Sequence, residues 1–142
     1  MLKYFSVISL FPEVVESYKN VSIVGRAVRN KLIDIKTLNP RDFVEKERHV
    51  DDAPYGGGPG MVMMIEPIVK SIRCAKKSVA GSPCVINLTP QGRPFKQSHA
   101  EELLSFDHLI FVSGRYEGID ERVGYYIDRE YSVGDYVLTG GA

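Results

Sequence analysis

Three glycine-containing loops carry the residue types best suited to chemistry: TPQGRP (89–94), GRYEGID (114–120) and GDYVLTGG (134–141). Glycine lets the main chain approach a ligand closely, so that backbone amides and carbonyls can bind the edge of a base. The loops include the carboxylates Glu117 and Asp120 but no lysine. This composition argues against a triphosphate site. It favours a neutral or cationic ligand, such as an adenosine with a cationic end.

A fourth glycine cluster lies in DDAPYGGGPGMVMM (51–64). The dinucleotide-binding fingerprint fails there, because Met61 stands where its third glycine is needed. The phosphate-binding Walker pattern fails as well, because no lysine follows Gly60 in register. The function of the cluster must therefore be judged with the rest of the chain.

Other catalytic classes find little support in the sequence. The three histidines are scattered, no Cys/His spacing is typical of zinc, and no metal site is predicted from these residues. No Gly-x-Ser-x-Gly nucleophile motif is present. We expect Cys74 and Cys84 to be reduced core residues and the histidines to be ordinary surface or strand-end residues.

These loops need elements to position them, and hydrophobic periodicity predicts strands that alternate with helices. The expected strands are 3–10, 33–39, 84–89, 108–113 and 125–133, and the expected helices are 12–18, 23–32, 67–79 and 97–106, with a helical turn at 119–123. This order predicts one α/β domain with a mostly parallel sheet and helices on both faces. The carboxyl ends of such strands are where ligands bind.

The composition is that of a globular chain: 142 residues, 44% hydrophobic and 25% charged, with a net charge of zero. Basic side chains predominate in residues 1–100 and acidic ones in 101–142. This asymmetry permits a basic face for nucleic acid without requiring one. No apolar stretch is long enough to span a membrane, so we expect no membrane partner and a cytoplasmic location.

A series of sequence blocks resembles the bacterial tRNA (guanine-N1) methyltransferase family of the TrmD type. The blocks are SLFPE (9–13), GRAVRN (25–30), NPRDF (39–43), VDDAPYGGGPGMVMM (50–64), LTPQGRPF (88–95), GRYEGIDERV (114–123) and SVGDYVLTGG (132–141). The resemblance implies one SPOUT methyltransferase domain over 1–142, with a deep C-terminal trefoil knot in about 84–141. It implies S-adenosylmethionine-dependent methylation of guanine N1 at the tRNA position 3′ of the anticodon, by a homodimer whose active site lies between subunits.

The resemblance also implies roles for individual residues. The expected methyl-donor contacts are Leu88, Thr89, Pro90, Gly92, Gly114, Tyr116, Gly118, Val133, Gly134, Asp135, Tyr136, Val137, Leu138, Gly140 and Gly141. The expected wall for the target guanine and the partner subunit is Tyr55, Gly56, Gly57, Gly58, Pro59 and Gly60. Glu117 is a candidate catalytic residue that contacts the guanine or an assisting Mg²⁺, and Arg115 is a candidate for a substrate phosphate or a neighbouring carboxylate.

The family places its catalytic aspartate, the general base, and an arginine beyond the knot. This sequence ends at Ala142, with GGA where the family pattern is GGE. We therefore expect the base and the C-terminal tRNA-binding domain to be absent, and the chain alone to bind the donor weakly or not at all and to lack activity. Two alternatives remain: a non-catalytic knotted module that binds RNA or a nucleoside, and a SPOUT methyltransferase with another RNA target.

Overall fold

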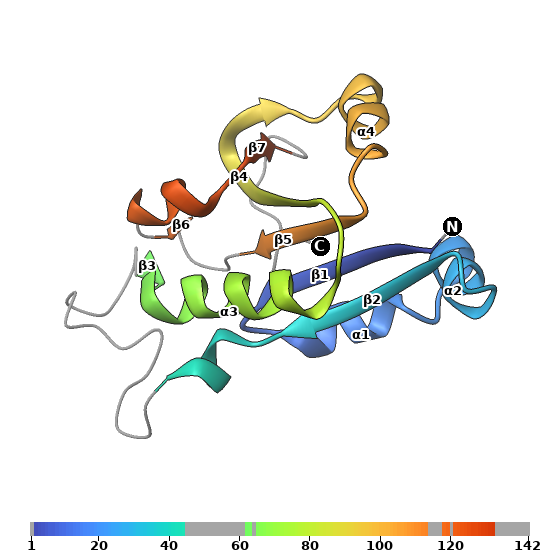
Figure 1. Cartoon of the computed structure of the whole chain (residues 1–142), viewed down its shortest axis with the longest axis horizontal. Helices are drawn as coiled ribbons and strands as arrows, with labels where there is room; N and C mark the ends of the chain where they lie inside the picture. The colour runs from blue at the N-terminus through green and yellow to red at the C-terminus, as the bar shows by residue number, and fades with distance from the viewer. Residues whose placement is uncertain (1, 45–61, 64, 114–117, 120, 133–142) are drawn as a thin grey trace.

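The structure, a computed structural model, describes residues 2–44, 62–63, 65–113, 118–119 and 121–132 (Figure 1). Its strands are β1 (Lys3–Ser9), β2 (Ile33–Leu38), β3 (Val62–Met63), β4 (Pro83–Pro94), β5 (His108–Ser113), β6 (Gly118–Ile119) and β7 (Arg129–Ser132). Its helices are α1 (Pro12–Tyr18), α2 (Ser22–Arg29), α3 (Ile65–Ser78) and α4 (Gln97–Leu103), with short 3₁₀ helices η1 (Pro40–Phe43) and η2 (Glu121–Tyr126).

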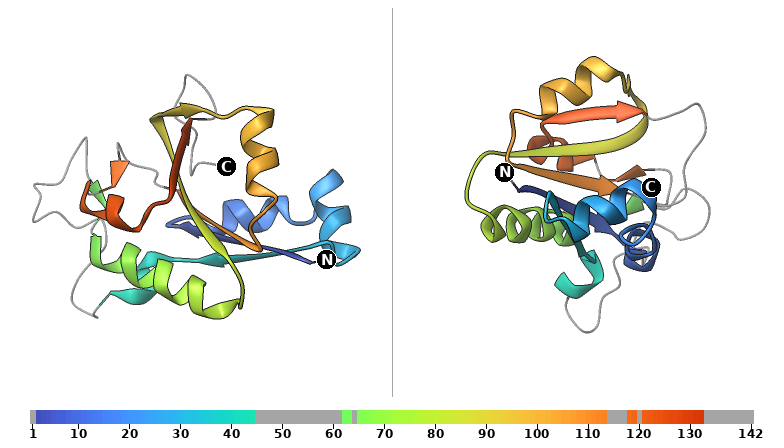
Figure 2. Two further views of the ribbon diagram at one scale, coloured as in Figure 1. Left: turned by 45° about the horizontal axis from the view of Figure 1, so that its top comes forward. Right: turned by 90° about the vertical axis from the view of Figure 1, so that its right-hand side faces the viewer.

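Five strands form the main sheet, in the order β2-β1-β5-β4-β7, and every pairing in it is parallel. The predicted α/β class is confirmed. Crossovers between parallel strands are right-handed, so the direction of each step decides which face its helix covers. The steps β1 to β2 and β4 to β5 run one way across the sheet and place α1 and α4 on one face. The steps β2 to β4 and β5 to β7 run the other way and place α3 and η2 on the opposite face, as Figure 2 shows for α1 and α3.

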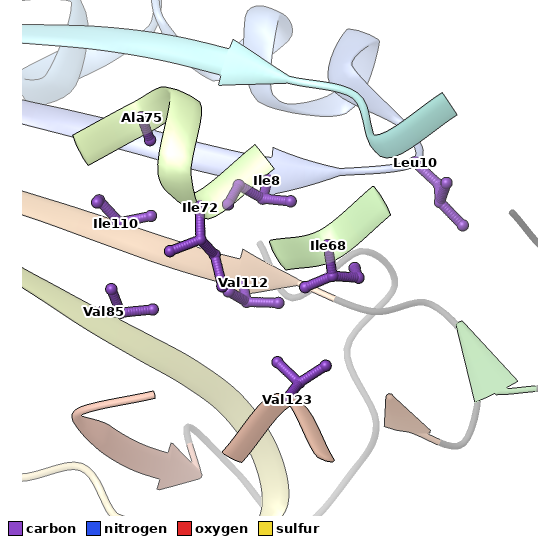
Figure 3. Packing of buried hydrophobic residues seen from close by; sticks show 9 residues of the cluster. All are labelled: Ile8, Leu10, Ile68, Ile72, Ala75, Val85, Ile110, Val112 and Val123. Atoms are coloured by element: carbon purple, nitrogen blue, oxygen red, sulfur yellow. The ribbon is translucent and has the colours of Figure 1, made fainter. Parts of the chain in front are cut away.

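The core on the α3 face is a continuous aliphatic cluster (Figure 3). The apolar side chains of α3 recur at helical spacing, as the sequence predicted, and Val123 of η2 joins them. The full cluster is Ile8, Leu10, Ile68, Ile72, Ala75, Val85, Ile110, Val112 and Val123. Complete burial of a side chain such as Ile72 contributes about 2–3 kcal/mol.

A second cluster covers the α4 face and consists of Cys84, Ile86, Leu103, Leu109 and Tyr131. Leu109 belongs to this cluster, while the next residue, Ile110, belongs to the first. Successive side chains of a strand point to opposite faces, and both faces are covered here. This explains the unbroken apolar run of β5 and confirms helices on both faces.

Several predicted bounds were wrong. The helix expected at 23–32 ends at Arg29, because Lys31 adopts a left-handed φ of 57° that ends the helix. The strand expected at 125–133 begins only at Arg129, because Tyr125 and Tyr126 belong to η2. The helix expected at 97–106 ends at Leu103.

Three further expectations have mixed outcomes. Cys84 is buried and free as expected, but Cys74 is exposed on α3 and is not a core residue. No helix in the described ranges is long and apolar enough to cross a membrane. The trefoil knot stays a prediction, because it involves residues 114–117, 120 and 133–142, which lie outside the described ranges.

Candidate functional site

Three parallel strands reach the same edge of the sheet, where ligands are expected in an open α/β fold. Ser9 at the end of β1 pairs with Ser113 at the end of β5. Leu88 of β4 pairs with the same Ser113 from the other side. These residues form one row along the carboxyl edge of the sheet, and their side chains share the α4 face. The shared carboxyl edge at which the loops were predicted to lie is therefore present, and ligand binding there stays a prediction.

β4 continues past this edge by an irregular path. Leu88 and Arg93 both pair with Tyr131 of β7, so residues 89–92 are an extra excursion on β4. Within it, the Thr89 hydroxyl donates a hydrogen bond to Oε1 of Gln91 at 3.0 Å, and both Pro90 and Gln91 are exposed. The expectation that 89–94 is a free loop was wrong, because both ends of the excursion pair with β7.

Gly92 has a packing role in this excursion. A Cβ at Gly92 would lie 2.7 Å from the amide nitrogen of Tyr131 and 2.9 Å from the carbonyl carbon of Glu130. Both contacts are to backbone, which cannot move aside as a flexible side chain can. The close approach of two main chains therefore requires glycine here. A contact between Gly92 and the methyl donor stays a prediction.

Two buried serines at the edge were not predicted as site residues. Ser9 is 1% exposed, and its Oγ accepts a hydrogen bond from the Phe11 amide at 3.0 Å. Ser113 is 2% exposed, and its Oγ has no hydrogen-bond partner among the residues that the structure describes. A buried hydroxyl without a partner costs about 1–3 kcal/mol, which a polar ligand atom would recover. For Ser113, the sequence could have indicated this position, because a serine ends an apolar strand directly before a glycine loop.

A separate two-stranded sheet joins distant parts of the chain beside this edge. Val62 of β3 pairs with Gly118 of β6, and Met63 pairs with Ile119. Figure 1 shows β3 and β6 side by side, past the end of β5. Val62, which directly follows 45–61, and Gly118, which directly follows 114–117, are thus neighbours. The described residues of two specific sequence blocks, VDDAPYGGGPGMVMM and GRYEGIDERV, therefore pair with each other.

Arg41 holds the chain that leaves β1 at the same edge. Its Nη1 donates to the carbonyl oxygen of Leu10 at 3.2 Å, and its guanidinium lies 5.8 Å from the centre of the Phe11 ring. The Asn39 side chain caps η1 by accepting from the Arg41 amide at 3.0 Å. The blocks SLFPE and NPRDF are therefore linked in space.

Among the described residues, the remaining reactive groups do not form a second site. His108 is buried at the amino end of β5, where its Nε2 lies 2.7 Å from the Ser6 hydroxyl, and burial lowers its pKa. Burial, with the negative charge of Asp128, raises the pKa of Cys84, so its thiol stays protonated at neutral pH. Within the described ranges, no three metal-ligating side chains come together.

The structure describes only part of the predicted site. Leu88, Thr89, Pro90 and Gly92 lie in β4 at or just past the edge, and the backbone of Gly118 lies in β6. The other predicted residues fall outside the described ranges: Tyr55, Gly56, Gly57, Gly58, Pro59, Gly60, Gly114, Arg115, Tyr116, Glu117, Val133, Gly134, Asp135, Tyr136, Val137, Leu138, Gly140 and Gly141.

Comparison with known proteins covers nearly the whole chain. The family model "tRNA (Guanine-1)-methyltransferase TrmD" matches residues 3–142. Proteins named tRNA (guanine-N(1)-)-methyltransferase from Photobacterium profundum and Shewanella sediminis are 53% and 51% identical to it, over 97% and 95% of this chain and 56% and 57% of their own length. The crystal structure of tRNA (m1G37) methyltransferase from Aquifex aeolicus superimposes with a TM-score of 0.85 at 35% identity, over 99% of this chain and 64% of that one.

The chain spans little more than half the length of these curated relatives. The match nevertheless includes every sequence block described above. The chain therefore belongs to the tRNA (guanine-1)-methyltransferase TrmD family.

Proposed function

We propose that this chain forms the methyl-donor domain of an S-adenosylmethionine-dependent enzyme that methylates N1 of the guanine 3′ of the anticodon in tRNA. The observation that carries the proposal is the pairing of β3 with β6, next to the carboxyl edge of the sheet. This pairing joins described residues of VDDAPYGGGPGMVMM and GRYEGIDERV. These are the blocks that distinguish the guanine-N1 family from other SPOUT enzymes. The names of the relatives support the same reaction.

The described part of the edge fits a nucleoside held through main-chain groups. Pro90 and Gln91 are exposed, and the buried Ser113 hydroxyl is unsatisfied among the described residues. S-adenosylmethionine would supply a methyl group on a positively charged sulfur. In the proposal, Leu88, Thr89 and Pro90 hold it on one side. The remaining donor contacts come from 114–118 and 133–141, in a SPOUT domain that covers 1–142.

Guanine N1 carries a proton that must leave as the new bond forms, so the reaction needs a general base. We place this base beyond Ala142, as the family resemblance implies. Glu117 is proposed to contact the guanine or an assisting Mg²⁺, and Arg115 to contact a phosphate or a carboxylate. The segment from Tyr55 to Gly60 is proposed as the wall that admits the guanine, because glycine lets a flat base approach the main chain. Gly58→Val should then weaken tRNA methylation more than donor binding.

The proposed enzyme is a cytoplasmic homodimer with its active site between subunits. This part of the proposal depends on the family resemblance. Light scattering on the purified protein tests it, because a monomer at working concentration would contradict the shared site.

Donor binding is tested by nuclear magnetic resonance, which detects weak complexes. Titration of the ¹⁵N-labelled chain with S-adenosylhomocysteine should shift the amides of Leu88, Thr89 and Ser113. The amides of Val24 and Ala27 in α2 serve as a control, because α2 lies by the start of β2, at the other end of the sheet. Amide shifts confined to α2 would contradict the proposed site.

The reaction is tested with the full gene product that contains this chain. It should transfer a labelled methyl group to a tRNA transcript with guanine 3′ of the anticodon, and not to the same transcript with adenine there. Donor binding without methyl transfer to any RNA would favour a non-catalytic knotted module. Equal transfer to both transcripts would favour a SPOUT enzyme with another target.

A further inference from the structure

An aromatic cluster lies just past the excursion of β4, outside the proposed donor contacts. The ring of Phe95 meets the ring of Tyr131 edge-on, with centroids 5.2 Å apart and planes at 77°. The ring centroid of His99 in α4 lies 4.9 Å from that of Tyr131 and 6.1 Å from that of Phe95. Tyr131 is 3% exposed, whereas Phe95 is 41% exposed. The Phe95 ring thus packs against the buried Tyr131 ring and keeps part of its surface in solvent.

Hydrogen bonds of the main chain, one of them to a side chain, hold the backbone on both sides of Phe95. The Phe95 amide donates to the carbonyl oxygen of Ser132 at 2.8 Å, which extends the ladder between β4 and β7. The next amide, of Lys96, donates to Nδ1 of His99 at 3.0 Å, and the His99 amide donates back to the Lys96 carbonyl oxygen at 3.0 Å. The position of the Phe95 ring is therefore set before any ligand arrives.

Two cationic residues stand on either side of Phe95 in the chain. Arg93 and Lys96 are exposed, and neither forms an ion pair with any residue in the described ranges. Arg93 pairs with Tyr131, so its side chain lies on the same face of the sheet as the aromatic cluster.

The described carboxylates of α4 and β7 are already engaged or face elsewhere. Glu102 forms an ion pair with Arg129 at 3.3 Å, and Glu130 accepts from the Asn87 side chain at 3.0 Å. Glu101 lies on the side of α4 opposite to His99, by the angular spacing of a helix. Among the described residues, the surface around Phe95 is therefore positively charged.

We propose that Phe95, flanked by Arg93 and Lys96, is a stacking site for an unpaired base of single-stranded RNA. Bases stack on exposed aromatic rings, and neighbouring cations bind the phosphates on either side. The proposal rests on the proposed function, in that RNA is the substrate. A protein partner is less well matched, because one exposed ring among charged residues is no apolar docking groove.

The test combines RNA affinity with a direct signal of stacking. A short single-stranded RNA that contains 2-aminopurine is titrated with the wild-type chain, since this base loses fluorescence when it stacks. Phe95→Leu keeps apolar packing on Tyr131 but removes the flat ring. We expect it to weaken RNA binding about tenfold and to abolish the quenching. Phe95→Trp should preserve both.

Charge variants test the phosphate contacts. Arg93→Ala and Lys96→Ala should each reduce the slope of log affinity against log salt concentration by about 0.7. The matched controls are Tyr18→Leu and Lys77→Ala, an exposed ring on α1 and an exposed cation at the end of α3. Both controls should leave affinity, quenching and salt dependence unchanged. Circular dichroism checks that every variant is folded.

The outcomes separate this inference from the function on which it rests. If the wild-type chain binds RNA and Phe95→Leu behaves like Tyr18→Leu, the stacking site is overturned and the proposed function stands. If the Arg93 and Lys96 variants keep the wild-type salt slope, the phosphate contacts are wrong. If the wild-type chain binds no RNA, the stacking site falls together with the RNA part of the proposed function. S-adenosylhomocysteine binding should persist in Phe95→Leu.

Discussion

Gly92 packs against the backbone of Tyr131 so closely that a Cβ at Gly92 would lie 2.7 Å from the Tyr131 amide nitrogen. We predict that Gly92→Ala lowers the free energy of unfolding by about 1–3 kcal/mol, because β4 and β7 must separate to admit the methyl group. Urea denaturation measures the change. Gly124→Ala is the matched control, since a Cβ there meets nothing within 4 Å. Equal stability of the two variants would show that the backbones are not in close contact.

Ser9 and Ser113 are neighbours on paired strands, yet they should respond in opposite ways to the loss of their hydroxyls. Ser9→Ala removes the acceptor of the Phe11 amide and should lower the free energy of unfolding by about 1 kcal/mol. Ser113→Ala removes a buried hydroxyl that has no partner in the described ranges, and should raise it by about 1 kcal/mol. Urea denaturation of both variants tests this. Destabilisation by Ser113→Ala would mean that the hydroxyl is satisfied in solution.

Burial of His108 predicts a pH-dependent stability. Burial lowers the pKa of His108 below its ordinary value of 6.5, so at mildly acidic pH the unfolded chain takes up a proton that the folded chain does not. The free energy of unfolding should therefore fall as the pH drops below about 6.5, by at most about 1.4 kcal/mol per pH unit for this group. The loss ends once the pH passes below the pKa in the folded state.

His108→Gln removes this titration. The variant should show a smaller difference in unfolding free energy between neutral and mildly acidic buffer than the wild type does. Denaturant melts at each pH provide the values. An unchanged pH dependence would place the responsible proton on another group.

Arg41 should contribute to stability through the turn after β1. Arg41→Met keeps much of the aliphatic side chain but loses both the hydrogen bond to the Leu10 carbonyl and the contact with the Phe11 ring. We expect a loss of about 1–2 kcal/mol in the free energy of unfolding. Lys36→Met, at an exposed position on β2, is the control and should change it by less than about 0.5 kcal/mol.

The sheet was predictable because its strands are buried on both faces. LIFV in β5 has no polar alternation, and the structure places its residues alternately in the two clusters. Element ends were less predictable. Tyr125 and Tyr126 have a high strand propensity, but burial of Val123 under α3 and the contact of Arg73 with the Tyr126 ring, 5.8 Å from its centre, favour η2 instead.

The carboxyl edge proposed for the site was predictable from the sequence, but its detailed structure was not. Glycine loops after consecutive strands indicate the carboxyl edge, because parallel strands end together there. The excursion of β4 could not be predicted, since it depends on how Leu88 and Arg93 share one partner in β7. The role of Gly92 follows from the same pairing. The unsatisfied hydroxyl of Ser113 likewise depends on which atoms the fold brings around it.

The pairing of β3 with β6 has a consequence for biosynthesis. Val62 leaves the ribosome long before its partner Gly118, and closing so long a loop is slow and costly in entropy. During translation β3 therefore waits without its partner strand until β6 has emerged. A nascent chain arrested before residue 118 can build part of the sheet, but it cannot assemble this corner of the molecule.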